Sequence, residues 1–585
     1  MSLGYDSGGR LSIVTLPTGS YQYGYTATSG QLATLSAPDG ESLAYSWDGF
    51  LSTGTTWSGA VTGSVTRTFD DNFRVTALNV DGSSTAYGYD NDGLLTGAGD
   101  ETITRDPGDG LIAASTLGGV ITAMTYDGFG EPLTDTVTDG ATNLYSVGYT
   151  RDNLGRITQK IETVNGTTTT WLYGYDGDGR LNAVTKNGLP VASYGYDQNG
   201  NRVSVNAAII ASYDNQDRLL TFGSNSYSYN ANGELLTKTN SIGTTSYTWD
   251  ALGNLLAVKL PSGEDIQYLY DGQNRLVGKE VNGKLIEGFL YDGQLEPVAM
   301  LDGSGNVVEL FVYGTRPNVP DYIIKGGAEY RVISDQVGSS ILIVNASTGA
   351  IAEQVSYDAR GNVTSDSNPG FQPFGFAGGL YDADTGLVHF GARNYDPETG
   401  RWISRDPVLF AGGDSNLYEY AISDPINMLD EFGLQGFAFL PYGYSQQDVN
   451  TAVAMQQARV SRLQTEAQRG AKFEQAYKCD FKSNQVFPLL QQFDSARSLG
   501  ALSLATTREA GLWEAETYGV LQAQQGAAWG SGLASTAAAA SYLFGAGEAA
   551  AFGLDAGDAI LSSYQAANES GFTPSMAGDL VHSGP

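Results

Sequence analysis

Cysteine and histidine are almost absent from this chain of 585 residues, which has one cysteine, Cys479, and two histidines, His389 and His582. A single cysteine cannot build a disulfide framework or a cysteine-based metal site. Two histidines are too few for a His- or Cys-type zinc site, and a Ser-His-Asp triad would have to recruit one of them. We therefore expect no metal and no cofactor.

Positive charge is also scarce, because 31 Lys and Arg residues face 64 Asp and Glu residues, for a net charge of −33. Such a surface repels phosphate backbones, so we expect no nucleic acid as a partner for the bulk of the chain. The acidic exterior is better explained as a solvated surface that keeps the protein soluble.

Glycine (76) and tyrosine (35) are abundant, and they occur in one short phrase that recurs along the chain. Tyr87-Gly-Tyr-Asp90-Asn-Asp-Gly-Leu-Leu is one copy, and Tyr173-Gly-Tyr-Asp176-Gly-Asp-Gly-Arg180-Leu is another. The aspartates of successive copies mostly lie 16 to 25 residues apart between Asp6 and Asp292. A fixed phrase with such a period indicates a repeat architecture.

Each repeat reads as a β-hairpin, because two short alternating runs flank a turn rich in Asp, Asn and Gly. Aspartate accepts hydrogen bonds from backbone groups two residues on, and glycine supplies a positive φ. A single hairpin cannot bury its aromatic face, but a stack of hairpins can. We expect the turn aspartates, including those that look like calcium loops near Asp90 and Asp176, to be structural.

Composition divides the chain into four segments. Clear repeats cover residues 1–300, and degenerate repeats continue over 301–370. Residues 371–434 have a different sequence pattern from the repeats. Residues 435–585 are rich in Ala, Gln, Glu and Leu, and their spacing is helical over 447–480 and 487–525. No signal peptide is visible, and the chain opens directly in a repeat phrase, so we expect it to be a fragment of a longer protein.

The text at 371–434 resembles the core of the Rhs (rearrangement hotspot) YD-repeat family, and the repeats resemble its shell. The matching residues are Phe374-Gly-Phe-Ala-Gly-Gly-Leu-Tyr381, His389-Phe-Gly-Ala-Arg393-Asn-Tyr-Asp396-Pro-Glu-Thr-Gly400-Arg-Trp-Ile-Ser-Arg405-Asp406-Pro and Asp424-Pro-Ile-Asn-Met-Leu-Asp430-Glu-Phe-Gly-Leu434. The resemblance, which extends to insecticidal toxin-complex C components, implies a hollow β-shell from a spiral of YD repeats, closed at one end by the core. It also implies a variable C-terminal effector held inside as cargo, and a secreted or cell-surface location.

The same resemblance implies an aspartyl autoprotease with Asp406 and Asp430 as the catalytic pair and a cut between Leu434 and Gln435. The chemistry is consistent, because two close carboxylates share one proton. The ionised one activates water and the neutral one protonates the leaving amide. We expect Arg405 to orient a carboxylate or polarise the scissile carbonyl. The alternative from spacing alone is that both aspartates only cap turns.

One position departs from the family pattern, since Glu431 stands where the family has proline after the second aspartate. Proline would fix the local turn through its locked φ, so the change bears on cleavage efficiency. For two other residues we expect no catalytic role. His389, between Val388 and Phe390, is expected to be a packed core residue, and Cys479 to be inert because it has no activating neighbour.

The tail, residues 435–585, contains no metal cluster and no P-loop, and an uncharged stretch at 521–547 is long enough to cross a bilayer. Alanine and glycine dominate that stretch, so a soluble helical domain is the preferred interpretation and a membrane pore an alternative. The expected function is delivery of this tail, with a secretion or delivery component and an immunity protein as partners. A second alternative is a non-cleaving adhesion protein that binds carbohydrate or protein.

Overall fold

A computed structural model of the chain describes residues 2–412, 414–434 and 437–438. The chain divides into two compact units, Met1–Asp448 and Val449–Pro585, and all described residues belong to the first. The helices expected at 447–480 and 487–525, Cys479, His582 and the stretch 521–547 lie outside the described residues. Within those residues, secondary structure is almost entirely β, as the sequence predicts.

Two long antiparallel meanders make up the repeats. The first runs from β1 (Ser2–Tyr5) to β21 (Ala208–Ile209), and the second from β22 (Ala211–Tyr213) to β37 (Val363–Asp366). Each strand pairs with the next in sequence, as β16 (Ile157–Val164) does with β17 (Thr167–Tyr175). The register shifts by a bulge at the residue before the turn aspartate, as between Gly174 and Tyr175. The bulge therefore recurs where the repeat phrase places its aromatic residue.

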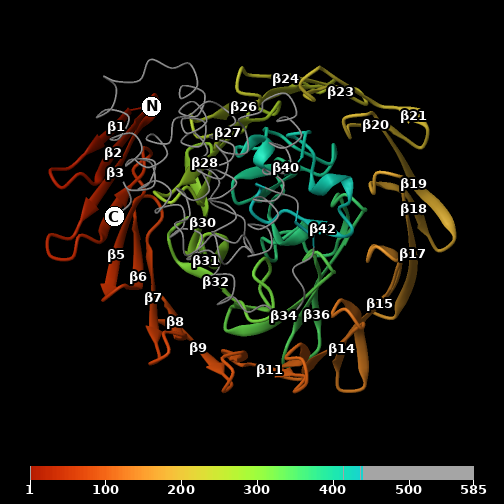
Figure 1. Cartoon of the computed structure of the whole chain (residues 1–585), viewed down its shortest axis with the longest axis horizontal. Coiled ribbons are helices and arrows are strands. Elements are labelled where there is room, and N and C mark those ends of the chain that lie inside the picture. The colour runs from red at the N-terminus through yellow and green to blue at the C-terminus, as the bar shows by residue number, and fades with distance from the viewer. Residues whose placement is uncertain (1, 413, 435–436, 439–585) are drawn as a thin grey trace, which may run out of the picture. The chain divides into compact units, whose positions relative to one another are not determined.

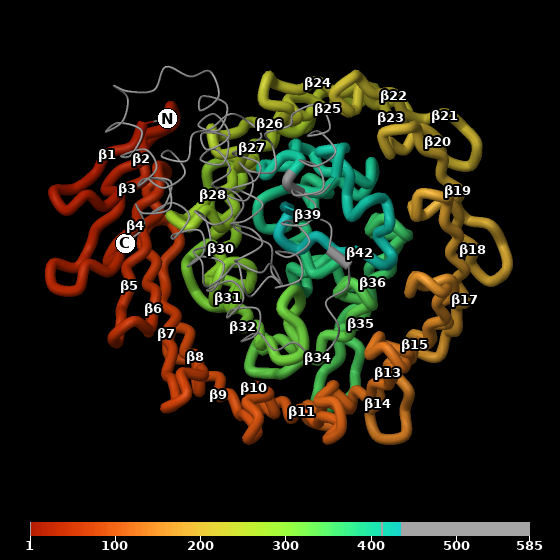
Figure 2. The backbone as a smooth tube through the Cα atoms, viewed as in Figure 1, coloured from red at the N-terminus to blue at the C-terminus, as the bar shows by residue number. Residues whose placement is uncertain are grey.

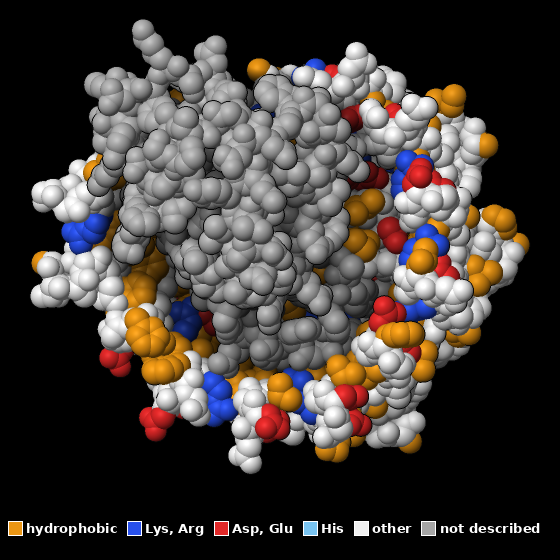
Figure 3. Space-filling model, viewed as in Figure 1, with side chains coloured by type: hydrophobic (Ala, Val, Ile, Leu, Met, Phe, Trp, Pro, Cys, Tyr) orange, Lys and Arg blue, Asp and Glu red, His pale blue; other side chains and the backbone are white. Residues whose placement is uncertain are grey.

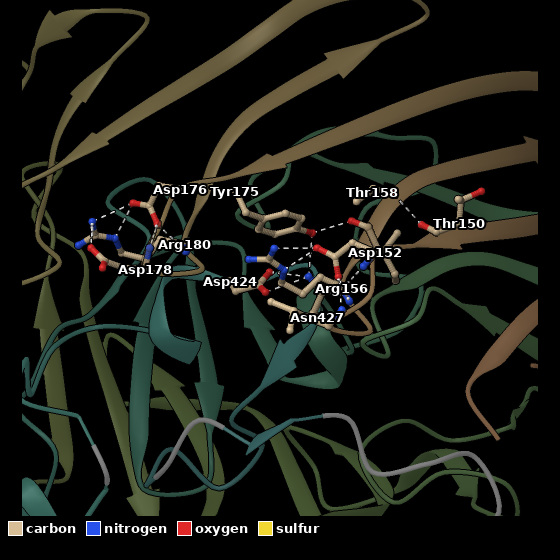
Figure 4. Close-up of polar contacts among 12 residues, drawn as sticks. Thr150, Asp152, Arg156, Thr158, Tyr175, Asp176, Asp178, Arg180, Asp424 and Asn427 are labelled. Atoms are coloured by element: carbon tan, nitrogen blue, oxygen red, sulfur yellow. Dashed lines mark hydrogen bonds and ion pairs between the residues drawn. The ribbon is translucent and has the colours of Figure 1, made fainter. Parts of the chain in front are cut away.

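Several repeat turns are closed by an aspartate and the arginine four residues later, as at Asp152 and Arg156. Asp152 Oδ1 accepts the N–H groups of Leu154 at 2.9 Å and Arg156 at 3.1 Å, and Arg156 Nη2 lies 2.7 Å from Asp152 Oδ2 (Figure 4). Gly155 between them has φ +82°, a conformation that favours glycine. The predicted structural role of the turn aspartates is therefore seen in full detail here.

The second aromatic residue of the phrase connects one repeat to the one before. The Tyr175 hydroxyl donates to the carbonyl of Ile157 at 2.6 Å, and the Arg156 guanidinium lies 4.6 Å from the centre of the Tyr175 ring. Arg156 thus joins its own turn aspartate to the next repeat through a cation–π contact. The same hydroxyl-to-carbonyl bond recurs at Tyr25, Tyr89, Tyr126, Tyr196, Tyr213, Tyr270, Tyr291 and Tyr313.

The meander winds back along itself, so that residues more than 200 positions apart become neighbours. The Trp57 indole N–H donates to Asp271 at 3.2 Å, and Arg331 Nη1 lies 2.6 Å from Glu101. Figures 1 and 2 show the later strands, from β28 (Asp265–Tyr270) to β36 (Ile351–Tyr357), on the inner side of the first ones. A buried apolar layer fills the space between the earlier strands and these later strands, and it includes Leu43, Val65, Val277 and Ile343.

Residues 371–434 form a compact body inside the wound sheet (Figure 1). A four-stranded sheet contains β38 (Leu380–Asp382), β39 (Leu387–Phe390), β40 (Arg393–Asp396) and β41 (Arg401–Trp402). It is followed by two 3₁₀ turns, η2 (Leu409–Gly412) and η3 (Ala421–Ser423), and by β42 (Met428–Leu429), which pairs with β43 (Phe437–Ala438). A further 3₁₀ turn, η1 (Phe376–Gly378), precedes the sheet.

Aromatic packing and polar contacts to the repeats hold this body in place. Phe376, Phe390, Tyr395, Trp402 and Tyr420 form its buried centre. Toward the wall, Arg401 donates to the amide oxygen of Asn201 at 2.8 Å, and Lys279 pairs with Asp382 at 2.7 Å. Since the polar contacts come from repeats distant in sequence, the body is fixed from several sides.

Candidate active site

The site begins where β42 ends, in a tight turn from Asp430 to Leu434. Asp430 is 1% exposed, and its Oδ1 accepts the Leu434 N–H at 2.9 Å. Gly433 has φ +65°, and a Cβ there would lie 2.6 Å from the Phe390 carbonyl oxygen. The glycine of the motif is therefore needed both for its backbone conformation and for close packing.

Asp406 comes to the same place from the segment that follows β41. Its Oδ1 accepts the Val408 N–H at 2.8 Å, and its own N–H donates to the Leu417 carbonyl at 2.8 Å. The residue is 6% exposed. Both aspartates are thus buried and fixed by backbone bonds.

One guanidinium, that of Arg393 on β40, joins the two carboxylates. Its Nη2 lies 2.9 Å from Asp406 Oδ2 and 2.8 Å from Asp430 Oδ2. Its Nε donates to the Gly433 carbonyl, and its guanidinium lies 4.2 Å from the centre of the Trp402 ring. Because two oxygens share one nitrogen, Asp406 and Asp430 must be close neighbours, and both are tied to the backbone of the turn that ends at Leu434.

The charges around Arg393 do not balance, since one cation faces two buried carboxylates. Burial raises the pKa of Asp406 to about 7, against the opposing effect of Arg393, and the nearby Asp430 raises it further. Close carboxylates in a poorly solvated site resist double ionisation. The pair can therefore hold one proton near neutral pH, which is the state that acid–base hydrolysis requires.

A small cavity of about 20 Å3 opens between these groups. Arg393, Asp406 and Asp430 line it together with Asp414 and Glu419. A volume of this size holds one water molecule. Burial, with the charge of Asp414, raises the pKa of Glu419 to about 8, so the far wall of the cavity also carries a carboxyl group that retains its proton.

Arg405, expected from the sequence to serve the aspartates, lies elsewhere. Its side chain is exposed and reaches toward Gly233, and its charge acts on the Tyr418 hydroxyl. The structure places Arg393 between the carboxylates instead. The sequence carried a signal for Arg393, because it stands inside the dense motif Ala392-Arg393-Asn-Tyr-Asp396, but nothing in that motif showed what its side chain would contact.

Glu431 is buried immediately beside the site. It is 8% exposed, and within the described part of the chain its Oε2 has no hydrogen-bond partner. Burial and the adjacent Asp430 raise the pKa of Glu431 to about 7. It lines a second cavity, of about 40 Å3, with His389 and Asn318. The residue that replaces proline here is thus a carboxyl held in an environment that disfavours its charge.

The segment that leads into the site is anchored to the repeat wall. The Asn427 side-chain amide donates to the Tyr175 hydroxyl at 2.7 Å and to Asp424 at 2.8 Å, and its Oδ1 accepts the Ile157 N–H at 2.7 Å. Figure 4 shows Asn427, Tyr175 and Asp424 beside the turn of Asp152 and Arg156. The position of β42 and Asp430 is therefore tied directly to the repeats.

The remaining predicted residues fall into two groups. His389 is half-buried, contacts Asn394 through Nδ1 at 3.2 Å, and has a pKa lowered to about 4 by burial. This fits a packed residue. Leu434 is 8% exposed, whereas Gln435 lies outside the described residues. Across the described ranges, no helix has the length and apolar character to span a bilayer.

Comparison with known proteins places these features in a family. The Teneurin YD-shell family model matches residues 1–426, more than two thirds of the chain. The chain therefore belongs to the Teneurin YD-shell family, and the match covers the repeats and most of the compact body at 371–434. The match includes Arg393 and Asp406 and ends before Asp430 and the expected cleavage site.

Curated proteins with sequence similarity to part of the chain include two teneurins and a bacterial nuclease. Teneurin-4 of Mus musculus is 28% identical over 376 residues, which are 59% of this chain and 13% of that protein. Teneurin-3 of Danio rerio is 32% identical over 310 residues, 49% and 11% respectively. The tRNA nuclease WapA of Bacillus subtilis is 31% identical over 293 residues, 46% and 12%. The chain thus spans a small part of the length of each relative.

Solved structures also share the fold. The crystal structure of TcdB2-TccC3-TEV superposes with a TM-score of 0.50 at 16% identity, over 74% of this chain and 27% of that one. At this identity the likeness concerns the fold, and it supports the wound β-sheet as a shell.

Proposed function

We propose that this YD-shell protein carries residues 435–585 as an effector and frees them by cutting its own backbone between Leu434 and Gln435. The observation that carries the proposal is the Arg393 guanidinium, which contacts Asp406, Asp430 and the Gly433 carbonyl together. A pair of aspartates that only capped turns would not need one shared cation that also holds the chain next to the expected cut.

The proposed reaction is addition of water to the Leu434 carbonyl. The ionised carboxylate of the pair takes a proton as the water oxygen attacks the carbonyl carbon, and the neutral carboxyl gives its proton to the Gln435 nitrogen. The carbon–nitrogen bond then breaks, leaving a carboxyl group on Leu434 and an amine on Gln435. Asp406, with a pKa of about 7, is assigned the protonated role. The cavity supplies the place for the water.

Arg393 positions the chain during this step. Its bond to the Gly433 carbonyl and the bond from Leu434 N–H to Asp430 hold the two residues before the cut. Holding the reacting groups in one geometry removes much of the entropic barrier. Once cut, the segment from Gln435 onward loses its covalent link to the shell.

A delivery role is supported by one relative. WapA is named as a tRNA nuclease, so a protein that is similar in sequence to part of this chain acts on tRNA. On this proposal the shell is secreted or cell-surface associated, and a delivery component and an immunity protein against the tail are its partners.

The proposal is tested first on a denaturing gel of the purified chain. Self-cleavage gives fragments of 434 and 151 residues, with Gln435 as the new N-terminus by mass spectrometry. Asp406→Asn and Asp430→Asn should each leave one full-length band, whereas Asp152→Asn, a matched change in a repeat turn, should not. A single full-length band from the unmutated chain would exclude self-cleavage.

The effector role needs a separate experiment. Residues 435–585 are expressed alone in bacterial and in eukaryotic cells, and growth is compared with expression of the shell alone. Growth inhibition in either host supports an effector, and normal growth in both contradicts it.

A second candidate, partner binding without cleavage, is favoured by the exposed turn tips. Phe50, Phe129 and Leu154 are 72%, 94% and 78% exposed, and each follows its turn aspartate by two positions. Figure 3 shows apolar side chains between charged ones along the rim of the described residues. Exposed apolar groups of this kind are typical of interaction surfaces. An intact chain on the gel would favour this candidate.

A further inference from the structure

Three apolar side chains stand exposed beside the cavity of the two aspartates. Leu409, Phe410 and Ile422 are 40%, 69% and 45% exposed. Leu409 and Ile422 line the cavity directly with Asp406 and Asp430. Apolar groups at the mouth of an acidic cavity are unfavourable in water unless something covers them.

The backbone that presents these side chains adopts an uncommon conformation. Leu409 has φ +55°, and Ala421, Ile422 and Ser423 have φ values of +49°, +51° and +52°. Left-handed conformations are rare for residues other than glycine and are unfavourable for a β-branched residue such as Ile422. Strain of this kind is concentrated at functional sites and ligand clamps.

The chain beyond the expected cut returns to this place. β43 pairs with β42, with Ala438 opposite Met428 and Phe437 opposite Leu429. β42 in turn contacts η3, which carries Ile422. The next residues in sequence, Phe439 and Leu440, are apolar and lie outside the described residues. Because they directly follow β43 in sequence, these two residues are the candidates to cover the apolar side chains at η3.

Charge favours the same occupant. Arg393 lines the cavity with Asp406, Asp414, Glu419 and Asp430, and its poorly solvated wall disfavours any further charge. Residues 435–447 contain no charged side chain. A neutral apolar segment can be covered here without an electrostatic penalty.

We propose that Leu409, Phe410 and Ile422 form an apolar subsite that seats Phe439 and Leu440 of this chain. Seating them on the far side of the cut would fix both ends of the turn, with Arg393 and Asp430 on the near side. The consequence for cleavage rests on the proposed function, but the contact itself does not require any cleavage.

The contact is tested in the uncleaved Asp406→Asn chain by limited digestion with chymotrypsin, which cuts after Phe439, whereas Pro441 protects the bond after Leu440. Leu409→Asn together with Ile422→Asn should speed cutting after Phe439 about tenfold, because the lost apolar contact is of that order. Asparagine adopts the left-handed conformation readily, so these changes should not disturb the backbone. Leu154→Asn, at an exposed turn tip, is the matched control.

The digestion test is completed by a substitution in the segment that is proposed to occupy the subsite. In a chain with Leu440→Ser, cutting after Phe439 should already be fast, and adding Leu409→Asn and Ile422→Asn should change it little, as coupled residues behave. Unchanged cutting in the Leu409→Asn, Ile422→Asn chain, an equal effect from Leu154→Asn, or full additivity with Leu440→Ser would each overturn the subsite.

Self-cleavage gives an independent reading. In the chain with both aspartates, Leu409→Asn with Ile422→Asn should slow appearance of the 151-residue fragment about tenfold, while Leu154→Asn leaves its rate unchanged. No fragment from the unmutated chain would refute the proposed cleavage and leave the subsite to be decided by digestion. Normal cleavage by the double variant with accelerated digestion would restrict the subsite to docking.

Discussion

The repeat turn at Asp152 and the site at Asp406 are built from the same parts and behave in opposite ways. In both, an aspartate caps a turn through backbone N–H groups and pairs with an arginine. Although burial acts to raise it, the pKa of Asp152 is lowered by Arg156 and by the N–H groups of Leu154 and Arg156. The pKa of Asp406 is raised to about 7.

The difference comes from stoichiometry and burial. Arg156 serves one half-buried aspartate, whereas Arg393 serves two buried ones. One cation neutralises one carboxylate, and the second carboxylate then holds its proton because its charge is poorly solvated. In the repeats, an aspartate paired with an arginine in a turn is therefore a structural element. In the core, two aspartates that share one arginine are a candidate acid–base pair, although the local sequences are similar.

The largest contrast is expected in the rate of self-cleavage. Asp406→Asn should lower the rate by about 10³-fold or more, as loss of an essential acid–base group does. Asp152→Asn should leave the rate within about twofold, because the hydrogen bonds and the ion pair of that aspartate among the described residues lie within its own turn. Fragment appearance on a gel over time measures both, and equal losses from the two changes would mean that Asp406 acts through folding alone.

The next largest difference is expected in how much Arg393 and Arg156 each contribute to the free energy of unfolding. In the uncleaved Asp430→Asn chain, Arg393→Met leaves Asp406 buried without its cation and should lower the free energy of unfolding by about 3–5 kcal/mol. Arg156→Met, at a partly exposed pair, should lower it by about 1 kcal/mol or less. Urea denaturation gives both values. Comparable losses would show that the core pair is no more demanding than a repeat turn.

The pH dependence should differ in sign between the two regions. Glu431 has a folded-state pKa of about 7, above its unfolded value, so its contribution to stability is present below about pH 4 and is lost as pH rises through 7. Asp152 has a lowered pKa, so its contribution is present above its unfolded pKa and lost as pH falls.

In the uncleaved Asp406→Asn chain, Glu431→Gln should therefore gain stability relative to its parent as pH rises from 4 to 8, by about 3 kcal/mol. Asp152→Asn should lose relative stability as pH rises from 2 to 5. Urea denaturation across pH measures both trends. A flat difference for Glu431→Gln would mean that this carboxyl is better solvated than its burial indicates.

The smallest effect is expected at the turn tips. Leu154→Asn should change the free energy of unfolding by about 0.5 kcal/mol or less, because the side chain is 78% exposed. Thermal denaturation tests this. A clear loss of stability would show that the tip packs against another part of the protein, which bears on its use as a control.

Much of the fold could be predicted from short stretches of the sequence. The repeat phrase predicted antiparallel hairpins with aspartate-capped turns, because the interactions that make them join residues within four positions. The Tyr175 hydroxyl bond to Ile157 was not predicted, because it depends on how one hairpin stacks on the previous one. In the core, the motif indicated Asp406 and Asp430, and the structure brings them together through Arg393.

The sequence by itself determined the repeat, the β-rich class, the acidic exterior and the two aspartates that stand where the repeats end. Only the tertiary structure decided that Arg393 rather than Arg405 serves them, that Glu431 is buried beside them, and that apolar side chains flank their cavity. The physical reason is the sequence separation of the residues that interact. A turn is fixed by neighbours along the chain, whereas Arg393 reaches Asp430 across 37 positions, and that contact exists only once the core has folded inside its shell.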